Sequence, residues 1–205
     1  MIEVLKNPLT PNYLKLKEII LSDNFHWENI ISTMDVVSNT EGHIHMPVDI
    51  HTFIPRPETT REDNSVTGSL SKKIGDAEGK SKSEYVDLCV TVMTEILDYS
   101  NLFGTYIFHR AATNRTHSGE GIQLSEPHID HNFPHNNLLV YLTNSGGETF
   151  VEGEKFNPKE DDVIVFEGEH YMKRPIKDRR VVLVSTFMPI PSPPSPLEAL
   201  LTSFR

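Results

Sequence analysis

The sequence predicts an α+β fold in which N-terminal helices support a double-sheet barrel of jelly-roll type. Two patterns indicate this. The first hundred residues contain two helical segments, and the chain after residue 103 contains many short apolar segments. Turn signals such as Asn144-Ser145-Gly146-Gly147 and Asn157-Pro158 separate those segments, as expected for antiparallel strands. A chain of 205 residues is expected to form one domain over residues 1–205.

Both helices are indicated by local features. Thr10 can cap a helix and Pro11 suits its first position, so a helix is expected from there to about Asp23-Asn24. The clearest helix covers residues 83–99, because its apolar residues recur at helical spacing and are expected to pack against a sheet. These residues are Tyr85, Leu88, Cys89, Val92, Met93, Ile96 and Leu97.

The remaining elements are expected to be strands. Leading strands are predicted at residues 43–46 and 48–51, where polar and apolar residues alternate, and Pro55 and Pro57 end this region. The Gly146-Gly147 pair is expected to form a hairpin turn. The strands after residue 103 are predicted at 103–110, 120–129, 136–143, 147–151, 162–167 and 180–187. The core barrel therefore occupies residues 103–188, after the helices and leading strands of residues 1–102.

Two segments contain no predicted helix or strand. Residues 58–82 are rich in polar and charged residues, which is typical of a binding loop or lid, or of disorder. The Pro-rich tail, residues 189–205, begins with an extended polyproline pattern, which favours a strip that covers the barrel over a recognition motif.

Composition excludes several classes of protein. The net charge of −10 argues against a protein that binds nucleic acid through its phosphates. Cys89 is the only cysteine, so no disulfide can form within the chain and a cytoplasmic location is expected. The first residues lack the pattern of a secretory signal, and no apolar stretch approaches the roughly 20 residues that span a bilayer. We therefore expect no membrane partner.

The segment Glu126-Pro127-His128-Ile129-Asp130-His131 carries the main chemical signal. In an extended chain His128 and Asp130 point the same way, and Ile129 points into the opposite layer. Iron(II) in oxygenases is bound by two histidines and one carboxylate that leave three positions open. His170 is the best third ligand, because it is expected just beyond the end of the apolar strand 163–166.

Arg180 opens a strand that is apolar on both faces. An arginine at the start of a buried strand needs an anionic partner or an exit to water, and its planar fork of donors fits a carboxylate. A dicarboxylate co-substrate would supply that anion. Arg179 is the alternative anchor, but the alternation of the strand favours Arg180.

The ordered motifs resemble the prolyl-4-hydroxylase-like branch of the Fe(II)/2-oxoglutarate-dependent oxygenase superfamily, over roughly residues 100–188. The matching positions are His128-Ile129-Asp130, residues 138–142, Gly146-Gly147-Glu148-Thr149, residues 158–166, His170 and Arg180. The resemblance implies a double-stranded β-helix, a cupin-like jelly-roll barrel.

The resemblance also implies a set of ligands. His128, Asp130 and His170 would bind Fe(II), and Arg180 and Tyr141 would hold the distal carboxylate of 2-oxoglutarate. With O2, such an enzyme is a dioxygenase that hydroxylates its substrate and releases succinate and CO2; ascorbate is a further candidate cofactor. The substrate would be a protein or peptide side chain such as proline, or a small molecule. The segment Phe108-His109-Arg110-Ala111 lacks the tyrosine that many relatives carry there.

Two other functions stay open. One is a cupin-like metal-dependent enzyme that is not an oxygenase, such as an isomerase, and the other is a non-catalytic binding module on the same fold. His131 and His135 are expected to be polar loop residues beside the site that could contact substrate. His43 and His45 share a strand face, but no carboxylate follows them at ligand spacing. His109 and His117 have no assigned role.

Overall fold

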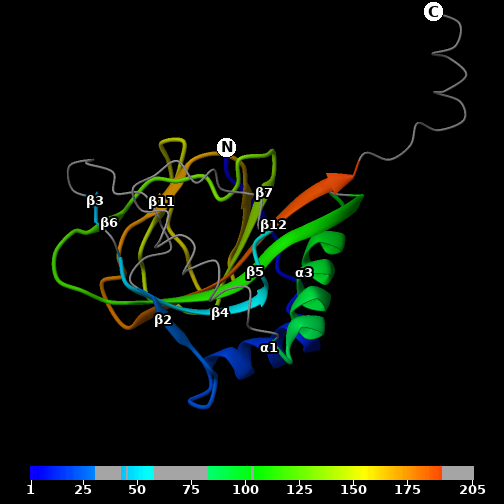
Figure 1. The fold of residues 1–205 in the computed structure, drawn as a ribbon, viewed down its shortest axis with the longest axis horizontal. Helices are drawn as coiled ribbons and strands as arrows, with labels where there is room; N and C mark the ends of the chain where they lie inside the picture. Colours follow the sequence, from blue (N-terminus) through cyan, green and yellow to red (C-terminus); the bar gives the residue numbers. More distant parts are fainter. Residues whose placement is uncertain (31–42, 45, 58–82, 103, 191–205) are drawn as a thin grey trace, which may run out of the picture.

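A computed structural model describes residues 1–30, 43–44, 46–57, 83–102 and 104–190 (Figure 1). In it, two helices lie together on one side of a large β-sheet, and the short strands β3, β6 and β11 lie toward the other side. The expectations for residues 58–82, for His45 and for the tail beyond residue 190 concern segments outside the described residues.

The large sheet has seven antiparallel strands in the order β1-β10-β7-β12-β5-β4-β2. Its strands are β1 (Glu3–Leu5), β2 (Glu28–Ile30), β4 (Val48–Ile54), β5 (Thr105–His117), β7 (Asn136–Tyr141), β10 (Val163–Phe166) and β12 (Arg179–Ile190). The central strand β12 pairs with β5 along its whole length and with β7 on its other edge. This order brings segments that are far apart in the sequence into one continuous layer.

A smaller sheet faces the inner side of the large one. It has the order β11-β8-β9, formed by β8 (Thr149–Val151), β9 (Glu154–Phe156) and β11 (His170–Met172). The parallel pair β3 (His43–Ile44) and β6 (Leu124–Ser125) adjoins it, because single bridges join Leu124 to Lys173 and His128 to His170. From β7 to β12 the chain passes from the large sheet to the small one and back twice. The predicted α+β fold with a jelly-roll, double-stranded β-helix barrel is therefore confirmed.

The helices are α1 (Pro11–Leu21) and α3 (Val86–Ser100). The Thr10 hydroxyl accepts a hydrogen bond from the Tyr13 backbone N–H, so the predicted cap and the proline at the first turn are confirmed. The predicted apolar stripe of α3 is also confirmed, since Cys89, Val92, Met93, Ile96 and Leu97 are fully buried. Among the described residues, no helix has the length and apolar character needed to cross a membrane.

Alternation along β7 and β12 divides the interior into two cores. Leu138 and Val140 pack with the helices in one cluster, whereas Leu139 and Tyr141 pack in a second cluster inside the barrel. Strand β12 has the same arrangement, with Val181 and Leu183 toward the helices and Val182 and Val184 inside the barrel. Because successive side chains of a strand point to opposite faces, one sheet serves both cores.

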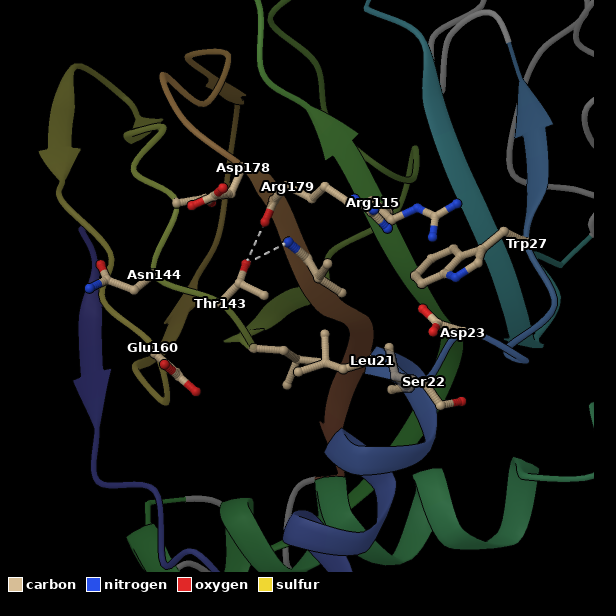
Figure 2. Close-up of a pocket in the computed structure, with 14 residues that line it drawn as sticks. Leu21, Ser22, Asp23, Trp27, Arg115, Thr143, Asn144, Glu160, Asp178 and Arg179 are labelled. Carbon is tan, nitrogen blue, oxygen red and sulfur yellow. Dashed lines mark hydrogen bonds between the residues drawn. The ribbon is translucent and has the colours of Figure 1, made fainter.

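Thr143 fastens β12 just beyond the end of β7. Its hydroxyl donates to the backbone carbonyl of Arg179 at 2.8 Å and accepts from the backbone N–H of Val181 at 3.0 Å (Figure 2). These bonds border a cavity of about 390 Å³ on the helix side of the sheet, near the end of α1, Trp27 and Arg115. The Arg115 guanidinium carbon lies 4.5 Å from the centre of the Trp27 ring.

Several strand predictions were wrong. The segment 120–129 contains only the two-residue β6, and β5 continues to His117 instead of ending at residue 110. Gly146-Gly147 is not a hairpin turn, because β7 and β8 belong to different sheets. Strands β1, β2, β9 and β11 were not expected; each has only three residues, too few for alternation to show.

Candidate metal centre

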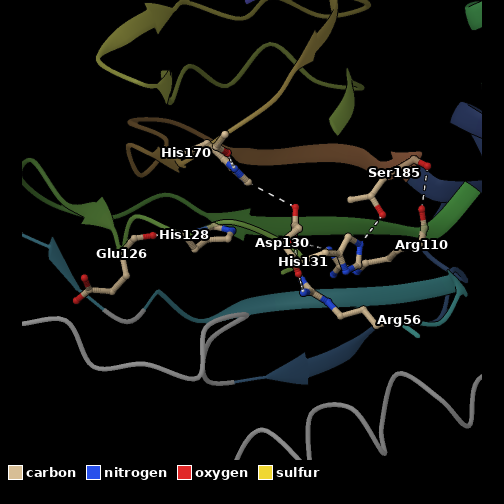
Figure 3. Close-up of polar contacts among 10 residues, drawn as sticks. Arg56, Arg110, Glu126, His128, Asp130, His131, His170 and Ser185 are labelled. Carbon is tan, nitrogen blue, oxygen red and sulfur yellow. Dashed lines mark hydrogen bonds and ion pairs between the residues drawn. The ribbon is translucent and has the colours of Figure 1, made fainter. Parts of the chain in front are cut away.

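The side chains of His128, Asp130 and His170 meet inside the barrel (Figure 3). Their potential ligand atoms all lie within 4.8 Å of one another, and His170 Nε2 is 3.7 Å from Asp130 Oδ2. Two atoms bound to one ion at about 2.1 Å each lie no more than about 4.2 Å apart, so the 3.7 Å pair already has the spacing of two such ligands.

The backbone holds the two histidines opposite each other. The His128 N–H donates to the His170 carbonyl at 3.0 Å, and the His170 N–H donates to the His128 carbonyl at 2.9 Å. Their rings are 4.3 Å apart between centroids. His170 lies just beyond the end of β10, as expected from the sequence, and it is also the first residue of β11, which the sequence did not predict.

Hydrogen bonds also select which ring nitrogen is available. Nδ1 of His128 donates to the Glu126 carbonyl at 3.1 Å, and Nδ1 of His170 donates to the Gly168 carbonyl at 3.3 Å. Such bonds leave the Nε2 lone pair of each neutral ring free to bind a metal. Burial and the neighbouring His170 lower the pKa of His128 to about 3, and burial lowers the pKa of His170. Both rings are thus neutral, as a metal ligand must be.

Two arginines hold Asp130. Arg56 donates from Nη1 to the Asp130 carbonyl and from Nη2 to its Oδ1, both at 2.7 Å, and Arg110 Nη1 lies 3.4 Å from the same Oδ1. Burial alone would raise the pKa of the Asp130 carboxyl, but Arg56 and Arg110 outweigh it and hold this pKa well below its usual value. Asp130 is therefore ionised, and its Oδ2 faces the histidines.

Arg180 lies in the same cavity as the three potential ligands. Its Nη2 donates to the Thr149 hydroxyl at 3.0 Å, its Nη1 lies 3.3 Å from the Met172 sulfur, and its guanidinium carbon lies 5.2 Å from the centre of the Tyr141 ring. The residue is 5% exposed, and its Nε is buried without a hydrogen-bond partner. No acidic side chain among the described residues forms an ion pair with it.

Arg179 points to the other side of the sheet. It is exposed and borders the cavity shown in Figure 2, on the face opposite to the barrel interior. Tyr141 is buried beside Arg180, and its hydroxyl forms a 2.7 Å hydrogen bond with the Thr149 hydroxyl. The barrel interior therefore contains Arg180, Tyr141 and Thr149 together.

One expectation near the centre needs correction. Ile129 does not enter an opposite layer, because it is 54% exposed. His131 and His135 lie in the loop before β7, as expected, but both are buried. His131 shares a 2.7 Å hydrogen bond with the Thr186 hydroxyl and stacks on Phe133. His43 is bonded to the Ser125 carbonyl at 2.6 Å through Nδ1.

Reasoning from the sequence missed several residues that line the cavity. Arg110, Asn114 and Thr116 lie on β5, where their spacing of two or four residues could have revealed a common face. Arg56 gave no such signal, because it stands between two prolines and meets Asp130 across 74 positions of the chain.

No protein-family model matches the sequence, and no curated protein matches it. Solved structures do resemble it. The chain resembles a viral collagen prolyl hydroxylase from Paramecium Bursaria Chlorella virus-1 with 15% identity and a TM-score of 0.49, over 93% of this chain and 96% of that one.

Two bacterial structures are similar in the same way. A 2OG-Fe(II) oxygenase family oxidoreductase from Burkholderia pseudomallei has 13% identity and a TM-score of 0.45, over 85% of this chain and 76% of that one. A prolyl-4-hydroxylase from Pseudomonas putida has 10% identity and a TM-score of 0.44, over 93% of both chains. Members of the 2OG-Fe(II) oxygenase family and prolyl hydroxylases are thus among the solved structures that this chain resembles.

Proposed function

We propose that this protein is an Fe(II)- and 2-oxoglutarate-dependent dioxygenase of the prolyl-4-hydroxylase-like branch, which hydroxylates its substrate. One observation carries the proposal: two neutral imidazoles, one carboxylate oxygen and a buried arginine without an acidic partner among the described residues line a single cavity. A metal site alone would not require that arginine.

The donor set fits iron(II). His128, Asp130 and His170 supply two nitrogens and one oxygen from one side, which is the set that non-haem iron oxygenases use, with open positions on the other side. The cation at Arg180 fits a carboxylate, because its Nε is buried and unpartnered and Thr149 and Tyr141 place two hydroxyls beside it. A dicarboxylate could therefore reach from the arginine to the metal.

The residues of the chain have separate tasks in this reaction. Iron(II), 2-oxoglutarate and O2 together supply the oxidising chemistry that hydroxylates a C–H bond and yields succinate and CO2. Arg180 and Tyr141 orient the co-substrate through its distal carboxylate, which reduces the entropic cost of the reaction. Leu139 and Val184 give the cavity an apolar wall that keeps water from the reacting atoms.

The substrate is proposed only as a class. A protein or peptide side chain such as proline is one candidate, and a small molecule is the other. Formation of succinate in the presence of Fe(II), 2-oxoglutarate and O2 is the readout for choosing between them, with candidate peptides and metabolites added one at a time.

The function is tested by adding Fe(II) and 2-oxoglutarate without oxygen and recording the visible spectrum. The proposal requires the weak metal-to-ligand charge-transfer band of the chelated keto acid. Metal binding without this band would favour a cupin-like metal enzyme that is not an oxygenase. Binding of neither metal nor keto acid would favour a non-catalytic module.

Arg180 and its neighbour provide a matched pair of variants. We expect Arg180→Met to weaken 2-oxoglutarate binding by about 10- to 100-fold, since a hydrogen bond to a charged group contributes about 1.5–3 kcal/mol. Arg179→Met removes an exposed arginine on the other face and should change this affinity by less than about twofold. Equal effects of the two substitutions on the titrated band would contradict the role of Arg180.

A further inference from the structure

We propose that Arg56 is a positioning residue of the metal centre, which fixes the Asp130 carboxylate so that Oδ2 alone faces the metal. The inference rests on the proposed function for the identity of the metal, but it concerns the chain's own residues. It assigns a role to a side chain that sequence patterns did not single out.

The contact between the two residues has a specific geometry. Arg56 lies two positions beyond β4, and its guanidinium spans the main chain and the side chain of one residue: Nη1 bonds the Asp130 carbonyl and Nη2 bonds Asp130 Oδ1, both at 2.7 Å (Figure 3). The terminal torsion of an aspartate has broad minima, so the carboxylate would otherwise rotate easily. Bonding the carbonyl and Oδ1 through one rigid fork restrains that rotation.

A second arginine occupies the same oxygen. Arg110, on β5, places Nη1 at 3.4 Å from Asp130 Oδ1. Both side chains of this pair are only 2% exposed, so the interaction is shielded from solvent. The two carboxylate oxygens are therefore unlike: Oδ1 contacts two guanidinium groups, and Oδ2 lies 3.7 Å from His170 Nε2.

This difference decides how many metal positions Asp130 can fill. An octahedral ion that binds two imidazoles and one carboxylate oxygen keeps three positions open. A carboxylate that bound through both oxygens would leave two, and a chelating keto acid would take both. By holding Oδ1 away, Arg56 preserves the third open position.

Orientation and charge make different predictions for Arg56→Lys. Two guanidinium groups beside a dication repel it, so their charge alone does not favour metal binding. If the fork matters, lysine fails to replace arginine, because an ammonium group cannot bond the carbonyl and Oδ1 in the same fixed geometry. If only the positive charge matters, lysine reproduces the wild type.

The test uses Co(II) with the full chain in the absence of 2-oxoglutarate, with affinity from competition against a chelator and coordination from the visible d–d spectrum. We expect Arg56→Met and Arg56→Lys each to lose about 10- to 100-fold in Co(II) affinity, the usual effect of removing a partner of a ligand, and to show an altered spectrum. Arg56→Lys with wild-type affinity and spectrum would overturn the proposal.

Arg174→Met is the matched control. Arg174 also bonds one main-chain carbonyl, that of His117 at 2.9 Å, and one side-chain oxygen, that of Gln123 at 2.6 Å, but it does not contact Asp130. Its substitution should change Co(II) affinity by less than about twofold. A loss as large as that of Arg56→Met would mean that any forked arginine supports the barrel, and it would overturn the specific role.

A double-mutant cycle separates positioning from general stability. In the Asp130→Ala background, Arg56→Met should cause no loss of Co(II) affinity, because the residue through which Arg56 acts is absent. An equal loss in both backgrounds would show a structural role and overturn the proposal. The unfolding free energies of the same variants show how much the contact between Arg56 and Asp130 stabilises the fold.

Failure of this inference is distinguishable from failure of the proposed function. If Co(II) affinity depends on Arg56 but the wild type forms no 2-oxoglutarate band, the oxygenase proposal fails and the positioning role stands. If the band forms and Arg56→Met binds Co(II) as the wild type does, only the positioning role fails. A wild-type chain that binds no Co(II) would overturn both.

Discussion

Among single residues, His51 combines burial with complete hydrogen bonding. Its Nδ1 bonds the His26 carbonyl at 2.9 Å, its Nε2 bonds the Ser83 hydroxyl at 2.8 Å, and its ring lies 4.4 Å from that of Phe25. It is 7% exposed, and burial lowers its pKa below the usual value. The folded protein therefore keeps His51 neutral at a pH where an exposed histidine takes up a proton.

The direction of this pKa shift predicts acid sensitivity. Because the unfolded chain binds the proton with a pKa of about 6.5, the contribution of His51 is present above that value and is lost as the pH falls toward the lower pKa of the folded state. As the pH falls below about 6.5, the wild type should lose stability faster than His51→Gln, by no more than about 1.4 kcal/mol per pH unit. Urea unfolding at several pH values measures both slopes, and parallel slopes would contradict the prediction.

Individual residues also show what the sequence could reveal about the site. His128 and Asp130 were recognisable because they are two positions apart in an extended segment, and His170 and Arg180 because of their order after a strong strand. The alternation of the strand favoured Arg180 over Arg179, and the structure has Arg180 inside the barrel. The spacing along β5 could have placed Arg110 on the inner face, but Arg56 was not recognisable, since its contact with Asp130 arises only when β4 and β5 pair.

Among the connecting elements, the segment between β7 and β8 depends on Gly147. Its φ is +85°, and a Cβ there would lie 2.8 Å from the Lys173 carbonyl oxygen and 3.2 Å from Arg180 Cδ. Both the backbone conformation and the close approach therefore favour glycine. The segment crosses from one sheet to the other directly beside the arginine of the cavity.

We expect Gly147→Ala to destabilise the protein by about 1–3 kcal/mol and to weaken 2-oxoglutarate binding through the displacement of Arg180. Gly153→Ala is the matched control, because Gly153 has a φ of +83° but no atom within 4 Å of the added Cβ. Gly153→Ala therefore has the conformational cost of a positive φ but not the steric clash expected at Gly147. If both variants lost the same stability and neither changed 2-oxoglutarate affinity, the steric argument would be wrong.

The secondary elements differ in how well the sequence predicts them. Helix α3 was predictable because its apolar residues repeat over fifteen positions, and α1 because of its Thr-Pro start. The second half of β5 was not, since Ala111, Ala112 and Asn114 have low strand propensity and are held by pairing with β4 on one edge and β12 on the other. Strand β9 contains the charged residues Glu154 and Lys155, which suit an edge strand but give no apolar pattern.

For the whole molecule, the large sheet separates a stabilising core from a chemical one. The helices pack on one face, and the metal centre lies on the other. Substitutions in the helix core should therefore change stability without changing the cavity, because additivity holds for residues without shared partners.

Ile96→Ala tests this separation. Ile96 is fully buried on α3, so its truncation should cost about 2–5 kcal/mol of unfolding free energy. Leu14→Ala, on the exposed side of α1, should cost less than about 0.5 kcal/mol. Both variants should keep wild-type Co(II) affinity when folded, and a metal site lost in folded Ile96→Ala would contradict the independence of the two cores.

The fold as a whole was predictable in class and in general arrangement. The succession of helices and then short strands indicated α+β, and the ordered motifs indicated the jelly-roll barrel. The exact membership of the two sheets was not predictable, because β1 and β2 are short and join the edges of a sheet whose centre is formed much later in the chain. That residues 1–205 form one domain stays a prediction.

Strand β12 has apolar residues on both faces from Val181 to Val184, so hydrophobicity alone does not determine which set enters the barrel. A shift by one position would exchange Arg180 for Arg179 and still bury valines and a leucine. The Thr143 hydroxyl, which grips the chain on both sides of Arg180, opposes that shift. Which of the two arginines meets an anionic ligand thus depends in part on the hydroxyl of Thr143. A substitution at this position would change the barrel cavity without altering any residue that lines it.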